Sequence, residues 1–390
     1  MSEALAIGVV CWASLGGSGV VASELAAGLA ARGHRVHVIA SAPPSRPLPD
    51  DPRLAFHRVP ATSHPVLGQP LYGLALAETL VEVCRRHALD VLHVHYAVPH
   101  AASAHLACAT LGAAAPRVVT TLHGSDVTSY GLAQRYDAVT RFAVLASDGI
   151  TVPSEFLRAE ARTCLDLGAD AAITVIPNSV DTRRFAPVAT RDPSCFDRWF
   201  ASPAGAGGGP VLVHVSNFRA VKRVADLIEV LARVRRSLPA RLVLVGDGPE
   251  RAAVEDLARA GGVADAVAFV GPRPDVAGEL PHADAFLLPS VTESFGVAAL
   301  EAMSAGVPVV AYRVGGLPDV VGDAGVLVEP FDVGAFADAT LAIVADPPRR
   351  AALGAAARAR AVERFDRVRI LDRWETYLRG VRATPRRTVS

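Results

Sequence analysis

The chain has 390 residues, with 39 basic and 39 acidic side chains, so its formal net charge is zero. Hydrophobic residues make up 51% of the sequence, which excludes an intrinsically disordered chain. The balanced charge argues against broad electrostatic binding to nucleic acid or to an anionic membrane. The length predicts two or three domains of about 150 residues each.

Neither a membrane helix nor a disulfide framework is expected. No run of about 18 uncharged apolar residues occurs. The apolar segment 5–15 follows Glu3 instead of basic residues and leads into a glycine turn, unlike a signal peptide. The five cysteines are widely spaced and contain no CxxC pair. We therefore expect a soluble, cytoplasmic protein.

The first half alternates β-rich runs with helical stretches, the pattern of βα units around a parallel sheet. A strand over residues 6–11 leads through a glycine turn at 16–19 into a helix over 20–32. Further strands are predicted at residues 35–40, 91–95, 118–122, 149–152 and 173–176.

A loop rich in glycine and proline over residues 202–210 interrupts the alternation, which then resumes. The second set of strands is predicted at residues 211–215, 241–246, 266–270, 285–288, 307–311 and 326–328. Helices are predicted at residues 222–237, 249–260, 296–304, 333–345 and 365–380, followed by a polar tail.

This order predicts an α/β protein with two tandem Rossmann-like domains, each with a doubly wound parallel sheet, facing each other across a cleft. We place the first domain at residues 1–190, a linker at 191–210 and the second domain at 211–364. Parallel sheets of this kind bind ligands at the carboxyl ends of their strands. Residues just after strands are therefore the candidates for a site.

The segment Gly16-Gly17-Ser18-Gly19 lies between a strand and a helix, where backbone N–H groups can hold a phosphate. It does not match the GxGxxG pattern of dinucleotide sites, and Ser41 and Ala42 stand where an acidic residue would bind the ribose of NAD. A tight turn without a ligand is the alternative.

Two carboxylates follow a strand of the second half: Glu293 in a loop and Glu301 in the next helix. Carboxylates accept hydrogen bonds from sugar hydroxyls, and the turn 294–296 would present free N–H groups. The pair suits a sugar nucleotide, with one carboxylate on the hexose and one on the ribose. The alternative is a helix N-terminal acid that complements the dipole, plus a surface glutamate.

Arg219, Lys222 and Arg223 lie near the start of a predicted helix, where the helix dipole disfavours cations. A diphosphate would offset that cost, and a solvated basic loop is the alternative. His123 follows another strand, a place where a lone histidine is more often structural than catalytic. His93 and His95 share one strand face, but no carboxylate or cysteine completes a metal site. We therefore predict no metal site.

Together these motifs resemble family four of the retaining glycosyltransferases, which have the GT-B fold. The resemblance extends over essentially the whole chain. It implies that a C-terminal helix over residues 365–382 packs back onto the first domain. Segments 93–100 and 216–223 resemble the branch that begins bacillithiol biosynthesis by transferring GlcNAc from UDP-GlcNAc to L-malate.

The resemblance also implies residue roles. The catalytic residues would be His123, Lys222 and Glu293. The donor-binding residues would be Gly16, Gly17, Arg219, Lys222, Gly271, Arg273, Glu293, Ser294, Phe295, Gly296 and Glu301. The acceptor-binding residues would be Ser18, Tyr96, Thr120, Thr121, Asn217 and Arg219.

Asn217 stands where most of the family has arginine, and the malate-using branch also has asparagine there. Whether Arg219 or Arg223 supplies the second cation for the diphosphate is left open. No cofactor or metal ion is expected, and family precedent suggests a homo-oligomer. The alternatives are a family member with another small acceptor, such as an inositol phosphate, and a non-catalytic sugar-nucleotide-binding protein.

Overall fold

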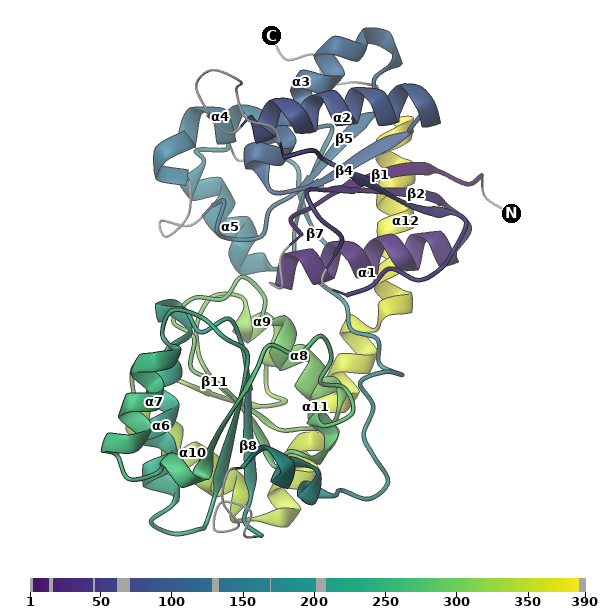
Figure 1. The fold of residues 1–390 in the computed structure, drawn as a ribbon. Helices are drawn as coiled ribbons and strands as arrows, with labels where there is room; N and C mark the ends of the chain where they lie inside the picture. The colour runs from purple at the N-terminus through teal and green to yellow at the C-terminus, as the bar shows by residue number, and fades with distance from the viewer. Residues whose placement is uncertain are drawn as a thin grey trace. The chain divides into compact units, whose positions relative to one another are not determined.

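The computed structural model describes residues 3–13, 17–44, 46–61, 71–127, 133–168, 170–200 and 208–385. The chain forms two compact units (Figure 1): Met1–Asn178 together with Val368–Ser390, and Ser179–Arg367. Each unit has a wholly parallel sheet with helices on both faces, of seven strands in the first unit and six in the second.

In the first unit the strand order is β3-β2-β1-β4-β5-β6-β7. The direction of winding reverses between β1 and β4, so the carboxyl ends of these two strands flank the switch point where such sheets bind ligands. The strands are β1 (Ala6–Val10), β2 (Arg35–Ala40), β3 (Leu54–Arg58), β4 (Val91–His95), β5 (Arg117–Thr121), β6 (Gly149–Val152) and β7 (Ile173–Val175). The helices are α1 (Gly17–Ala31), α2 (Tyr72–His87), α3 (Ala102–Leu111), α4 (Ala133–Leu145), α5 (Glu155–Cys164) and α12 (Arg367–Ala383).

Helices α1 and α12 cover one face of this sheet. Ile370, Trp374 and Leu378 of α12 are buried against it, and burial of such side chains contributes about 1.5–3 kcal/mol each. Gly28 of α1 makes the close packing possible, since a Cβ atom there would lie 2.7 Å from Leu371 Cδ1. Helices α2 and α3 cover the opposite face.

In the second unit the strand order is β10-β9-β8-β11-β12-β13, with its own switch point between β8 and β11. The strands are β8 (Val211–Val215), β9 (Arg241–Val245), β10 (Val267–Gly271), β11 (Ala285–Leu288), β12 (Val309–Tyr312) and β13 (Val326–Val328). The helices are α6 (Val224–Val234), α7 (Arg251–Ala260), α8 (Val297–Ser304), α9 (Leu317–Val321), α10 (Val333–Val344) and α11 (Pro347–Phe365).

The end of the chain differs from the sequence-based expectation. A single helix was predicted over 365–380, but α11 ends at Phe365 and α12 continues to Ala383. Asp366 breaks the helix because its backbone is extended, with ψ at 135°, and its carboxylate accepts a hydrogen bond from Thr182 Oγ1 at 2.5 Å. The polar tail, which was predicted to follow residue 380, therefore begins later, after Ala383.

Other elements also have boundaries that differ from the predicted ones. The helix predicted over 222–237 spans only Val224–Val234, since Arg223 has a left-handed backbone with φ at 47°. The strand predicted from residue 307 begins at Val309. Strand β3 and helices α2, α3, α4, α5, α9 and α11 were not predicted. No helix in the described ranges is both long enough and apolar enough to span a membrane.

Candidate functional site

In the first unit, candidate residues gather at the carboxyl ends of β4 and β5. His95 ends β4, and its Nδ1 lies 2.7 Å from Nε2 of His123, which follows β5. Burial lowers the pKa of His123 to about 3, so its ring is neutral near pH 7. A neutral imidazole at this position can exchange hydrogen bonds with a sugar hydroxyl but does not supply a positive charge.

Asp126 fixes the loop that carries His123. Its Oδ1 accepts hydrogen bonds from the backbone N–H groups of His123 and Gly124, both at 3.0 Å. Gly124 has φ at 109°, which favours glycine, so the loop can fold back tightly. Burial raises the pKa of Asp126 to about 6, and the hydrogen bonds from backbone N–H groups oppose this shift. Asp126 was not predicted as a positioning residue, although it lies three residues after His123.

Tyr96 and Ser18 meet in the first unit. The Tyr96 hydroxyl donates to Ser18 Oγ at 2.9 Å. Ser18 lies in the first turn of α1, directly after Gly17, so this hydrogen bond joins the start of α1 to the carboxyl end of β4. Gly16 lies outside the described residues.

The two threonines predicted to bind the acceptor are buried in the first unit. Thr120 Oγ1 is 2.7 Å from Ser147 Oγ, and Thr121 Oγ1 is 2.7 Å from His93 Nε2. Both hydroxyl groups therefore already have interior partners. Their role in acceptor binding stays a prediction.

In the second unit, Lys222 and Glu293 form an ion pair. Lys222 Nζ donates to Glu293 Oε1 at 2.5 Å, and Ser290 Oγ donates to the same oxygen at 3.0 Å. The side chains are only 20% and 12% exposed, respectively, so water screens their attraction weakly. Their loops are joined as well, because the Val291 N–H donates to the Val221 carbonyl at 2.9 Å. Ser290 was not predicted as a partner of Glu293, although it precedes Glu293 by three residues.

The two candidate arginines have different surroundings. Arg223 donates twice to Asp226, at 2.7 Å from Nε and 2.6 Å from Nη2, and its guanidinium lies over the Phe331 ring. Arg219 is exposed, and its guanidinium has no hydrogen-bond or ion-pair partner among the described residues. Asn217, two residues earlier, is also exposed. The geometry therefore favours Arg219 as the cation that is available to a ligand.

A turn over residues 293–296 presents the first N–H groups of α8. Gly296 has φ at 97°, and a Cβ atom there would lie 2.5 Å from Leu317 Cδ2. Phe295 is 2% exposed and packs edge-on against Phe365, so it anchors the turn in the core. The Gly316 N–H donates to the Glu293 carbonyl at 2.8 Å, which holds the other end of the turn.

The remaining predicted donor residues also lie in the second unit. Glu301 is buried at 7% exposure, inside α8. Gly271 ends β10 with φ at 76° and accepts a hydrogen bond from the Gly246 N–H at 2.9 Å. Arg273 pairs with Glu279 at 3.4 Å and lies over the Trp199 ring. The binding roles of these residues, and of Ser294, stay predictions.

Comparison with known proteins identifies both halves of the chain. Residues 15–184 match the family described as Glycosyltransferase Family 4, and residues 196–360 match Glycosyl transferases group 1. The chain is 38% identical to N-acetyl-alpha-D-glucosaminyl L-malate synthase of Bacillus anthracis, over 95% of this chain and 96% of that protein.

A second relative is a GDP-mannose-dependent alpha-(1-6)-phosphatidylinositol monomannoside mannosyltransferase of Mycolicibacterium smegmatis. It is 36% identical over 69% of each chain. The fold resembles that of sucrose-phosphate synthase from Thermosynechococcus elongatus, with a TM-score of 0.80 and 24% identity over 97% of this chain and 99% of that one. The chain therefore belongs to family four of the glycosyltransferases and has the GT-B fold.

Proposed function

We propose that this glycosyltransferase moves GlcNAc from UDP-GlcNAc to the hydroxyl group of L-malate, with retention of the anomeric configuration. The products are GlcNAc-α-malate and UDP, the first step of bacillithiol biosynthesis. The observation that carries the proposal is the 38% identity to a GlcNAc–malate synthase along 95% of the chain. The mannosyltransferase relative supports the reaction class but matches only 69% of the chain.

The donor is held mainly by the second unit in this proposal. Lys222 and Glu293 neutralise each other at 2.5 Å in the unliganded protein. With donor bound, the Lys222 ammonium group contacts the diphosphate, while Glu293 accepts hydrogen bonds from the hydroxyls of the hexose. The N–H groups of Phe295 and Gly296 add donors to the same sugar, and Glu301 accepts from the ribose.

Arg219 supplies the second positive charge. Arg223 is held by Asp226, whereas Arg219 is exposed and has no partner among the described side chains. Two cations and the N–H groups at a helix start can balance the charge of a departing diphosphate. We therefore propose that the transfer needs no divalent metal ion. Turnover that is abolished by EDTA and restored by magnesium or manganese would contradict this.

The transfer itself is proposed to occur by front-face displacement. The malate hydroxyl oxygen bonds to the anomeric carbon on the side from which UDP leaves, while the bond from that carbon to the diphosphate oxygen breaks. The proton of the hydroxyl passes to an oxygen of the leaving diphosphate. The protein contributes positioning and electrostatic stabilisation, and no carboxylate acts as a nucleophile.

The acceptor contacts in this proposal are mostly neutral. Ser18, Tyr96, Thr120 and Thr121 of the first unit and Asn217 of the second carry no charge, and Arg219 can pair with a malate carboxylate. A phosphorylated acceptor would need more cations than this set supplies. The composition of the set therefore favours a small dicarboxylate over an inositol phosphate.

The test is UDP release by purified protein given UDP-GlcNAc and a panel of acceptors. We expect release to require L-malate, and nuclear magnetic resonance of the product to show an α-linked sugar. UDP release that requires an inositol phosphate instead of L-malate would refute the malate assignment, but the assignment of glycosyltransferase activity would stand. Binding of UDP-GlcNAc without release under any acceptor would favour a non-catalytic binding protein.

A further inference from the structure

Three histidines outside the candidate site converge at one edge of the first sheet. His37 lies on β2, His57 lies on the edge strand β3, and His87 is the last residue of α2. In the parallel register, His37 pairs with Ala55 and His57 pairs with Ile39. Side chains two residues apart on a strand share a face, so His37 and His57 project from the same face.

The three imidazoles are close enough to share one ion. Nδ1 of His37 is 2.9 Å from Nε2 of His57, and one ring nitrogen from each histidine can be chosen so that all three lie within 4.8 Å of one another. The rings are tilted at 33° to 57° and do not stack face to face, with centroids 4.1 to 5.4 Å apart. In the described part of the chain this is the one such cluster of potential metal ligands.

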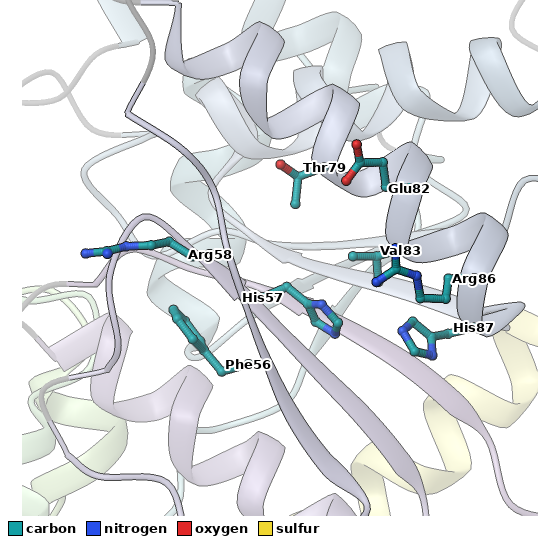
Figure 2. Close-up of a pocket in the computed structure, with 8 residues that line it drawn as sticks. All are labelled: Phe56, His57, Arg58, Thr79, Glu82, Val83, Arg86 and His87. Carbon is teal, nitrogen blue, oxygen red and sulfur yellow. The ribbon is translucent and has the colours of Figure 1, made fainter.

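A cavity of about 250 Å³ opens beside two of these rings (Figure 2). Figure 2 shows the His57 and His87 rings together at one side of it, with the Glu82 carboxylate turned away from them. The cavity leaves room for a fourth ligand that does not come from the protein. Arg58 and Arg86 also line it, so that ligand would be water, hydroxide or a small anion.

We propose that His37, His57 and His87 bind a divalent transition-metal ion, with a ligand from the adjoining cavity completing a four-coordinate site. Neutral imidazole nitrogens are the ligands that suit zinc and its neighbours among the transition metals, and three protein ligands with one open position is an established zinc geometry. Zinc is the ion of choice because it accepts tetrahedral coordination readily.

The ring nitrogens of the cluster have few other partners. No carboxylate pairs with any of the three rings, and His87 has no hydrogen-bond partner among the described residues. Only one ring–ring hydrogen bond links the three side chains, which leaves other ring nitrogens available.

The bound ion would tie an edge strand to its neighbours. Strand β3 pairs only with β2 among the described strands, and the site would join both strands to the end of α2. None of the three histidines belongs to the predicted donor or acceptor set. We therefore place the ion outside the proposed transfer reaction, and this inference does not depend on the proposed function.

The test uses the full chain without a histidine tag, after treatment with EDTA and its removal. Cobalt(II) is then titrated in and followed by visible absorption, and zinc is titrated by calorimetry. We expect one ion for each chain, the intense visible bands of four-coordinate cobalt, and no thiolate charge-transfer band. Zinc should also raise the midpoint of thermal unfolding.

The variants are His57→Ala and His87→Ala, with His87→Gln in reserve because it retains a polar side chain at the partly exposed helix end. Each should weaken zinc binding by more than about tenfold, since loss of outer-shell partners alone costs 10- to 100-fold. The matched control is His105→Ala, because His105 lies in the same unit and its ring contacts the Ala143 carbonyl outside the cluster. The proposal is overturned if the parent chain binds no ion, or if folded His57 and His87 variants bind as tightly as the control.

Discussion

At the scale of single residues, the most informative position is Lys222, the one lysine among 39 basic residues. Its compact ammonium group lies 2.5 Å from Glu293 Oε1, and the neighbouring Ser290 also donates to that oxygen. Planar guanidinium groups bind carboxylates and phosphates in a different geometry, so an arginine is not an equivalent replacement. The two side chains neutralise each other in the unliganded protein. In the proposed mechanism, the diphosphate and the sugar of the donor separate them.

We predict that Lys222→Ala lowers kcat by about 100-fold or more, the cost of removing one preorganised group that stabilises developing charge. Donor affinity should fall much less, because the charge on the diphosphate grows as UDP leaves. Steady-state kinetics of UDP release checks this. A change in KM alone would contradict the proposed role, and full activity of Lys222→Arg would show that any cation suffices.

We predict that Glu301→Ala weakens UDP binding by about tenfold or more, because a hydrogen bond to a charged group contributes about 1.5–3 kcal/mol. Calorimetric titration with UDP measures the effect. Glu229→Ala is the control, since Glu229 pairs with Arg233 on the exposed surface of α6. Because Glu301 is buried, the melting temperature of the variant is measured first. Unchanged UDP affinity in a folded variant would refute the ribose assignment.

At the scale of elements, short turns decide where the candidate groups lie. The turn before α8 depends on a positive φ at Gly296, on the buried Phe295 ring, and on the hydrogen bond from Gly316 to Glu293. The left-handed backbone of Arg223 likewise separates the turn that holds Lys222 from helix α6.

We predict that Gly296→Ala destabilises the second unit, because a left-handed backbone at a residue with a side chain costs about 1–3 kcal/mol and the new Cβ atom would approach Leu317. For a unit of this size, each kcal/mol lowers Tm by about 2–4 °C. Differential scanning calorimetry provides the measurement. Gly278→Ala is the matched control, since a Cβ atom there meets nothing within 4 Å. An equal Tm for both variants would contradict the prediction.

At the scale of the whole molecule, the two units differ in their buried histidines. Burial lowers the pKa of His93 and His123 to about 3 and that of His100 to about 4, all in the first unit. In the second unit His214 shows the same shift, to about 4. A histidine with a lowered pKa contributes stability that is present above about pH 6.5 and is lost as the pH falls toward its folded-state pKa.

We therefore predict that acidification from about pH 7 to about pH 5 destabilises the first unit more than the second. Each such histidine lowers the free energy of unfolding by up to about 1.4 kcal/mol for each pH unit below its pKa in the unfolded chain. Asp126 has the opposite effect, because its pKa is raised to about 6 and it therefore stabilises the fold as the pH falls. The destabilising effect of the three histidines is larger than this contribution.

Tryptophan fluorescence can follow the first unit alone. In a Trp199→Phe variant the remaining tryptophans, Trp12 and Trp374, both lie in the first unit. The thermal unfolding midpoint that this fluorescence reports should be lower at about pH 5 than at about pH 7. Calorimetry of the same variant should show a smaller decrease for the second unit. A midpoint that does not change between the two pH values would refute the prediction.

The sequence by itself determined the parallel α/β class and the reaction family. Strand β1 is a continuous apolar run, and β8 is an apolar run with one histidine, His214. Motifs such as Glu293 to Glu301 are local patterns that need no partner to be recognised. Edge strand β3 was missed because it is only partly buried and its short sequence, Leu54–Arg58, includes a histidine and an arginine. Helix α11 was missed because its buried positions are mostly small residues, Gly354, Ala357 and Ala361, which give only a weak apolar pattern.

Only the tertiary structure decided which of these groups act on one another. The choice between Arg219 and Arg223 depends on Asp226 and Phe331, and the second of these is far away in sequence. The pairing of Lys222 with Glu293 and the meeting of His37, His57 and His87 join separate elements through strand order and helix packing. Distances and burial of this kind arise from long-range packing, which no local pattern of residues encodes.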